Sequence, residues 1–128
     1  MTTIDLTAAT FEQTVADNGI VLVDFWAAWC GPCRSFAPVY ETASAFHPDL
    51  VFGKVDTEAE RELAGAAGIR SIPTLMVFRE GLLIYAQPGA MPAQALEELI
   101  GAVKAADMDA VRAEFAEQAT QEPAESPA

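Results

Sequence analysis

The sequence predicts an α/β fold in which a mixed sheet carries helices on both faces. Three observations lead to this prediction. Strand and helix patterns alternate along the first 104 residues, one strand pattern is apolar on both faces, and a tight-turn dipeptide separates the last two strands. A chain of 128 residues with 52% hydrophobic side chains can bury one core, so we expect a single folded domain.

The first strand and helix patterns lead into a buried central strand. Residues 4–6 are β-like, and a threonine at position 7 or 10 is placed to cap a helix that continues to about Asp17. The run Ile20–Trp26 (IVLVDFW) is apolar at every position but one, which is typical of a strand covered from both sides. We therefore place this run at the centre of the sheet.

Two helices and a strand follow the central strand. Pro32 suits the first position of a helix over about 32–47, because a proline has no N–H that would lack a partner there, and Pro38 predicts a kink. Residues 51–56 have a strand pattern, and a further helix is expected over about 58–67. Since helical crossovers join parallel strands, the first strands of the sheet should be parallel.

The last part of the pattern adds a hairpin and a helix. Strands over 74–78 and 82–86 flank a Glu-Gly dipeptide at 80–81, which is typical of a tight turn between antiparallel strands. A helix begins near Pro92 and continues at least to Lys104. The element order βαβαβαββα predicts the mixed sheet, with an antiparallel hairpin at its edge.

The charge of the chain excludes several classes of function. Seven basic and nineteen acidic residues give a net charge of −12. So acidic a chain lacks the clustered cations that bind a nucleic-acid backbone or an anionic membrane. Its apolar runs are too short to span a bilayer, and its first residues do not resemble an export signal. We expect a cytoplasmic protein that binds neither nucleic acid nor membrane.

The end of the chain differs in composition from the rest. Residues 105–128 contain six acids and one base, against thirteen acids and six bases before them. Apolar residues at 108, 111 and 115 recur at spacings of three and four, which predicts a short amphipathic helix followed by a disordered tail. We therefore divide the chain into a domain over 1–105 and an acidic extension over 106–128. Packing of this extension onto the domain and docking of a partner both stay open.

The two cysteines, Cys30 and Cys33, lie between the central strand and the next helix. Such a pair indicates redox chemistry or half of a metal site. Free N–H groups and the dipole at a helix start stabilise a thiolate, so Cys30 is predicted as the attacking nucleophile. Cys33, one turn further, is predicted to resolve the mixed disulfide. The chain's one histidine, His47, would lie about 20 Å along the same helix, which argues against a shared metal.

Asp24 is the one charged residue in the buried run, and burial should raise the pKa of its carboxyl group. A carboxyl with a pKa nearer neutrality can accept a proton from Cys33, directly or through one water molecule. Lys54, in the neighbouring strand pattern, could pair with Asp24 across the sheet. Both residues have a plainer interpretation, Asp24 as a cap of the following loop and Lys54 as a solvated lysine at the sheet edge.

Two stretches, DFWAAWCGPC at 24–33 and GIRSIPT at 68–74, resemble the hallmark motifs of the thioredoxin family. Pro38, Gly81 and Gly89 add further matches, and the resemblance covers about residues 3–104. It implies the thioredoxin fold, a three-layer α/β/α sandwich with a mixed five-stranded central sheet and four flanking helices. It also implies a cis peptide bond before the proline of the second motif.

The resemblance implies a protein-disulfide reductase that performs dithiol–disulfide exchange, maintains the cell's redox homeostasis and acts as a monomer. No bound cofactor is implied beyond the redox-active disulfide Cys30–Cys33. Its partners would be client proteins with reducible disulfides and a flavoprotein, the NADPH-dependent thioredoxin reductase. Asp24 and Lys54 gain their catalytic roles from the same resemblance. The implied docking face for substrates is flat and apolar, and consists of Trp29, Gly31, Pro32, Ile72, Pro73, Gly89 and Ala90.

Some residues depart from the family pattern. Arg34 stands where lysine is common, and Pro88 stands where an apolar β-branched residue is more usual, which removes one backbone donor beside the docking face. Two other functions stay open, a disulfide oxidase or isomerase with a less reducing cysteine pair, and a non-enzymatic subunit that docks a partner on the same face. The Gly-Pro dipeptide between the cysteines and the missing export signal favour the reductase.

Overall fold

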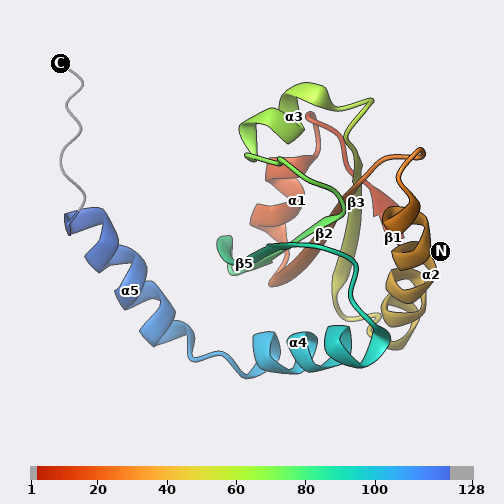
Figure 1. The fold of residues 1–128 in the computed structure, drawn as a ribbon. Helices are drawn as coiled ribbons and strands as arrows, with labels where there is room; N and C mark the ends of the chain where they lie inside the picture. The colour runs from red at the N-terminus through yellow and green to blue at the C-terminus, as the bar shows by residue number, and fades with distance from the viewer. Residues whose placement is uncertain (1–2, 122–128) are drawn as a thin grey trace, which may run out of the picture. The chain divides into compact units, whose positions relative to one another are not determined.

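Strand β2 (Ile20–Trp26) is the centre of a five-stranded mixed sheet in the computed structural model, which describes residues 3–121 (Figure 1). The other strands are β1 (Thr3–Asp5), β3 (Val51–Asp56), β4 (Thr74–Arg79) and β5 (Leu82–Pro88). The helices are α1 (Phe11–Asp17), α2 (Gly31–Phe46), α3 (Arg61–Ala66), α4 (Ala93–Ala105) and α5 (Met108–Gln121). The chain separates into two units, Met1–Glu97 and Glu98–Ala128, and the boundary falls within α4.

The strand order in the sheet is β1-β3-β2-β4-β5. Strand β3 is parallel to both β1 and β2, whereas β4 is antiparallel to β2 and to β5. The predicted mixed sheet of five strands, with parallel first strands and a C-terminal hairpin, is therefore confirmed. Strand β2 has a parallel neighbour on one side and an antiparallel neighbour on the other. Because β2 is the middle strand, the loop that follows it begins in the interior of the sheet.

Successive side chains of β2 point to opposite faces of the sheet. Val21, Val23 and Phe25 belong to a core cluster with Val15 of α1, and Leu63 of α3 packs against this cluster. Figure 1 shows α1 and α3 on one side of the sheet and α2 on the other. The intervening side chains, Leu22 and Asp24, therefore belong to the α2 face.

Helix α2 is anchored to its face of the sheet by a buried tyrosine. The Tyr40 hydroxyl donates a hydrogen bond of 2.8 Å to the carbonyl oxygen of Gly53, and its ring lies 5.3 Å from the ring of Phe52. Burial, the largest cause, and the charge of Asp24 raise the pKa of this tyrosine well above its ordinary value.

Helix α3 begins at Arg61, three residues later than the sequence pattern predicts. The side chain of Asp56 explains the difference, because its Oδ1 accepts hydrogen bonds from the backbone N–H groups of Glu58 and Ala59. These bonds hold residues 57–59 in a turn in place of the expected first helical residues.

The second unit contains α5, which begins after Asp107. The Oδ1 atom of Asp107 accepts hydrogen bonds from the N–H groups of Asp109 and Ala110, so this residue caps the helix. The sequence predicts a disordered tail from Thr120 onward, but Thr120 and Gln121 are the last residues of α5. The rest of the predicted tail, from 122 onward, lies outside the described residues, and the division of the chain at 105/106 stays a prediction. Among residues 3–121, no helix is both long and apolar enough to cross a bilayer.

Candidate active site

Cys30 and Cys33 form a disulfide where β2 ends and α2 begins. Cys30 is the N-cap residue of α2, and Cys33 lies in the first helical turn. Both are buried, with exposed fractions of 4% and 3%. The backbone N–H of Cys33 donates to Cys30 Sγ over 3.2 Å. A helix N–H directed at this sulfur favours its thiolate once the disulfide is reduced.

The segment before β4 lies beside the disulfide. The Ile72–Pro73 peptide bond is cis, as the resemblance predicts. Ile72 packs against a small cluster of Ala27 and the two cysteines, and its carbonyl oxygen lies 3.7 Å from Cys30 Sγ. Gly89 donates its N–H to the carbonyl oxygen of Pro73 over 2.8 Å, at a positive φ of 107° that favours glycine. The residues of the predicted docking face thus come from three neighbouring segments.

A groove of about 440 Å³ opens beside the disulfide. Four residues of the predicted docking face line it, namely Trp29, Gly31, Pro32 and Ile72, together with Cys30. Of the other three, Pro73 is buried, whereas Gly89 and Ala90 are exposed outside the lining. The groove also contains residues that the sequence reasoning missed, namely Thr57, Ala64, Ile69, Arg70 and Ser71. Arg70 and Ser71 lie within the second motif, so that motif could have pointed to them.

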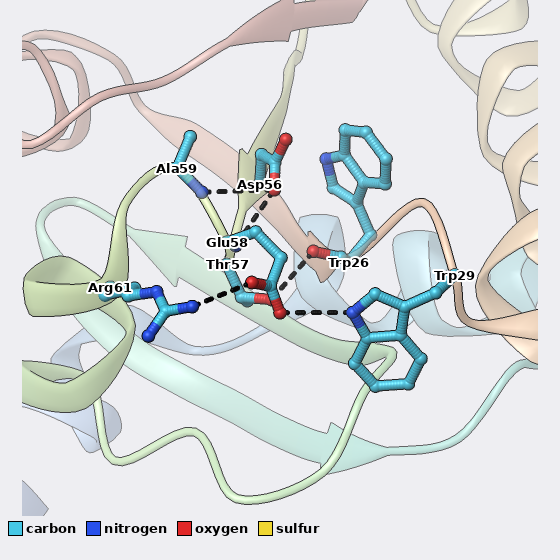
Figure 2. A network of polar contacts seen from close by, with 7 residues as sticks. All are labelled: Trp26, Trp29, Asp56, Thr57, Glu58, Ala59 and Arg61. Atoms are coloured by element: carbon cyan, nitrogen blue, oxygen red, sulfur yellow. Dashed lines mark hydrogen bonds and ion pairs between the residues drawn. The ribbon is translucent and has the colours of Figure 1, made fainter.

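One wall of this groove is Trp29, which has 67% of its surface accessible. Its indole Nε1 donates to Glu58 Oε2 over 3.1 Å, and Arg61 donates to the other oxygen of Glu58, also over 3.1 Å (Figure 2). Figure 2 shows the carboxylate between the guanidinium and the indole ring. Glu58, which the sequence reasoning missed, therefore orients Trp29.

The turn that carries Glu58 is attached to the end of β2. Both the N–H and the hydroxyl of Thr57 donate to the carbonyl oxygen of Trp26, over 2.9 and 3.0 Å (Figure 2). Because Trp26 ends β2 just before the loop with the cysteines, the same strand end supports the disulfide and the Glu58 turn. Trp26 itself packs against the cysteine cluster, beneath the site.

Asp24 is the buried carboxyl group of the site, with 1% of its surface accessible. Burial, opposed by the positive charge of Lys54, raises the pKa of Asp24 from 3.8 to about 7. Among residues 3–121, neither carboxyl oxygen of Asp24 has a hydrogen-bond partner. Asp24 therefore does not cap the following loop, which removes the plainer interpretation of this residue. It shares the α2 side of the sheet with the helix that carries Cys33.

Lys54 is the neighbour of Asp24 in the register of β2 and β3. The predicted cross-strand pairing is correct in register, but no hydrogen bond joins the two side chains. Instead, Lys54 Nζ lies 5.0 Å from the centroid of the Trp26 ring, a cation–π distance. Lys54 acts on Asp24 through space, by lowering the pKa that burial raises. It is partly buried in an inner strand, not at a sheet edge.

His47 lies at the far end of α2 as its C-cap residue, as predicted. Its Nε2 is 2.7 Å from Glu97 Oε1. Among residues 3–121, the structure contains no group of three or more histidine, cysteine or acidic side chains placed to hold a metal ion.

Comparison with known proteins gives a consistent result. A family model described as Thioredoxin matches residues 2–102. "Putative thioredoxin 2" of Streptomyces coelicolor is 60% identical over 119 residues, which cover 93% of this chain and 89% of that protein. Thioredoxin 1 of Synechococcus elongatus is 48% identical over 89 residues, 68% of this chain and 83% of its own. A solved structure of Plasmodium falciparum thioredoxin superposes with a TM-score of 0.72 at 38% identity, over 81% of this chain and 99% of its own.

Proposed function

The chain belongs to the thioredoxin family and is a thiol-disulfide oxidoreductase, and on that premise we propose that it reduces client disulfides with Cys30 as attacking and Cys33 as resolving residue. The observation that carries this assignment is the hydrogen bond from the Cys33 N–H to Cys30 Sγ. It supports a thiolate at Cys30 and gives the two buried cysteines different roles.

The reaction consists of two exchanges. In the first, the Cys30 thiolate attacks one sulfur of the client disulfide. The Cys30–client bond forms, the client disulfide breaks, and its second sulfur leaves as a thiolate that takes up a proton. In the second, the Cys33 thiolate attacks Cys30 Sγ, and the first client sulfur leaves in the same way. Two electrons pass to the client, and the Cys30–Cys33 disulfide of the structure is the oxidised product.

Asp24 supplies the base for the second exchange in this proposal. Cys33 has to lose its proton before it attacks, and a carboxyl group with a pKa of about 7 can accept that proton near neutral pH. Burial of Asp24 without a hydrogen-bond partner supports this role, because an unpaired buried carboxylate is costly and is found mainly where chemistry requires it. Lys54 tunes the pKa of Asp24 downward in the same proposal.

The docking face takes an extended client segment over the groove. The exposed Trp29 and the partly buried Ile72 offer apolar area in the groove that Cys30 also lines. The same proposal includes Gly31 and Pro32 at the start of α2 in this face, with Pro73, Gly89 and Ala90 beside Ile72. Main-chain hydrogen bonds to residue 72 would bind clients with little dependence on sequence.

Members of this family exchange electrons with a reductase and with client proteins that carry disulfides. For this chain we propose a flavoprotein reductase that uses NADPH, whose two electrons convert the Cys30–Cys33 disulfide back to two thiols. We place the reaction in the cytoplasm, where reduced glutathione keeps exposed thiols reduced.

Substitution of each cysteine tests the proposal. We expect Cys30→Ser to abolish reduction of insulin disulfides, and Cys33→Ser to accumulate a mixed disulfide between Cys30 and the client, detected by mass spectrometry. Full activity of Cys30→Ser would contradict the proposed roles. A double Cys→Ser variant that keeps the biological role of the chain in cells would favour the non-enzymatic docking function instead.

A further inference from the structure

A second groove, of about 330 Å³, continues the active-site groove on the α1/α3 face of the sheet. The two grooves share Ile69, Arg70 and Ser71 as lining residues. We call the second one the β5 groove, because Leu83 and Ala86 of β5 line it beside Met76 of β4. These side chains are apolar, so the continuation offers apolar contact area to whatever occupies the active-site groove.

The local fold explains why this area is open. Helix α3 ends at Ala66, and Gly68, with a positive φ of 75°, turns the chain away toward the Ile72–Pro73 segment. Strand β5 is the last strand of the sheet. Met76 of β4 is 7% exposed, but Leu83 of β5 is 38% exposed on the same face. The apolar surface on this face of the sheet therefore continues beyond the end of α3, as far as Leu83 of β5.

Arg70 lies at the junction of the two grooves and is exposed. Within residues 3–121, its guanidinium has no hydrogen bond and no ion pair. The two other arginines near the disulfide are occupied, because Arg61 pairs with Glu58 and Arg34 donates to the carbonyl oxygen of Ala28 over 2.9 Å. Arg70 is thus an unneutralised cation beside the reactive sulfur, in a chain of net charge −12.

We propose that the two grooves together hold one extended segment of a client protein, with an acidic side chain at Arg70 and an apolar side chain in the β5 groove. The inference rests on the proposed function and names the clients that the site prefers. A free guanidinium forms paired hydrogen bonds with a carboxylate. The rest of this acidic chain repels an acidic client, so preference for such a client has to come from Arg70.

The test uses the reduced full-length chain and a series of peptides, each with one intramolecular disulfide. Members of the series differ only in a glutamate, glutamine or lysine placed at successive positions beside the cysteines. The second-order rate constant of peptide reduction is measured by chromatography. At one position, we expect the glutamate peptide to react about threefold to fivefold faster than the glutamine peptide at low ionic strength. The lysine peptide should be slower, and the differences should nearly vanish near 1 M salt.

Variants at position 70 test whether Arg70 is the residue that recognises the charge of the peptide. Arg70→Gln should bring the glutamate-to-glutamine ratio close to one, and Arg70→Glu should make the lysine peptide the fastest. Arg79→Gln is the matched control, because it removes the same charge at the far end of β4, about 17 Å along the strand from Thr74. This control should keep the wild-type ratio.

A second pair of variants tests the β5 groove. With a leucine or a serine placed beyond the acidic position of the peptide, the wild-type chain should prefer leucine about threefold. Leu83→Ser should remove that preference. Ile4→Ser, which changes an exposed apolar side chain on the opposite edge strand, should retain it.

The outcomes separate this inference from the proposed function. Equal reduction of all peptides by the wild-type chain, or an unchanged ratio in Arg70→Gln, overturns the inference and leaves the reductase function intact. So does an Arg70 variant that slows only turnover with the partner reductase. Failure of the wild-type chain to reduce any of the peptides would instead count against the proposed function itself.

Discussion

Two carboxylate groups near the disulfide, those of Asp24 and Glu58, differ in burial and in hydrogen bonding. On the α2 side, Asp24 is 1% exposed, and neither of its oxygens has a hydrogen-bond partner within the described part of the chain. On the groove side, the side chain of Glu58 is 50% exposed and binds both Trp29 and Arg61. Glu58, which water could stabilise, therefore has two partners, whereas the buried Asp24 has none among residues 3–121.

Because of this difference, we assign different roles to the two carboxylate groups, proton transfer to Asp24 and orientation of Trp29 to Glu58. A buried carboxylate without a partner is expensive to ionise, and the cost is expressed as a pKa near neutrality, where proton transfer is useful. The exposed carboxylate of Glu58 accepts a hydrogen bond from the indole of Trp29 and orients that ring. We therefore expect large, pH-dependent effects on the α2 side and small effects on the groove side.

The largest expected effect concerns stability. The pKa of Asp24 is raised in the fold from 3.8 to about 7, so the folded chain holds this proton more tightly than the unfolded chain. The associated stability is complete below pH 3.8 and is lost as the pH rises through about 7. The shift corresponds to about 4 kcal/mol. The free energy of unfolding of oxidised Asp24→Asn, relative to wild type, should therefore increase by about that amount between pH 4 and pH 8, measured with denaturant.

The oxidised state suits this measurement because the disulfide cysteines do not titrate. Glu58→Gln is the matched control, since it removes an exposed carboxylate and should change the free energy of unfolding by about 0.5 kcal/mol or less at any pH. A stability difference for Asp24→Asn that does not vary with pH would show that this carboxyl group does not titrate in the assigned range.

The next effect is kinetic. Asp24→Asn should slow the release of client from the mixed disulfide at pH 7 by at least about tenfold, because Cys33 then lacks its base. The wild-type rate should fall as Asp24 becomes protonated below pH 7, and the variant should lose this dependence. Stopped-flow measurement of a preformed mixed disulfide isolates the step. An unchanged pH profile in the variant would remove Asp24 from proton transfer.

A smaller effect is expected where α2 is anchored. Tyr40→Phe removes the buried hydroxyl that donates to the carbonyl oxygen of Gly53, which should cost about 1–2 kcal/mol of stability. Because the hydroxyl lies apart from the groove, kcat/KM with insulin should change less than twofold. Thermal unfolding and insulin reduction measured on the same samples check both parts. A loss of activity larger than the loss of folded protein would mean that Tyr40 also acts in the reaction.

The smallest effect belongs to Glu58. Glu58→Gln keeps an acceptor for the Trp29 indole but loses the ion pair with Arg61, and should lower kcat/KM about twofold or less. Trp29→Phe, which loses the N–H donor, serves as the comparison. The fluorescence anisotropy of Trp29 should fall in Glu58→Ala, because the indole becomes freer. Unchanged anisotropy would contradict the orienting role of Glu58.

Local patterns were sufficient to predict the sheet and the position of the cysteines. The apolar run with a single aspartate identified both the central strand and the unusual carboxyl group, because burial on two faces and an isolated charge are both visible in sequence. Pro88 was recognised as a departure, and its place in edge strand β5 shows why a missing donor is tolerated. The cis bond and the docking face came from resemblance and not from residue patterns.

The contacts that the sequence does not predict join residues that are distant in sequence. Glu58 and Trp29 are 29 positions apart, and no local rule links an exposed acid to an exposed indole. The helical pattern predicts too early a start for α3, because that pattern does not include the capping preference of Asp56. Arg70 was within a recognised motif, but its free guanidinium and its place between two grooves depend on the tertiary fold.

The reduction potential of the Cys30–Cys33 pair tests the central claim most directly. The full-length chain is equilibrated with defined ratios of reduced and oxidised glutathione, the thiols are trapped with acid and alkylated, and the two forms are counted by mass spectrometry. We expect a potential well below that of the cytosolic glutathione pool, so that electrons flow from this chain to client disulfides. A potential well above that pool would contradict the reductase assignment and favour a disulfide oxidase or isomerase.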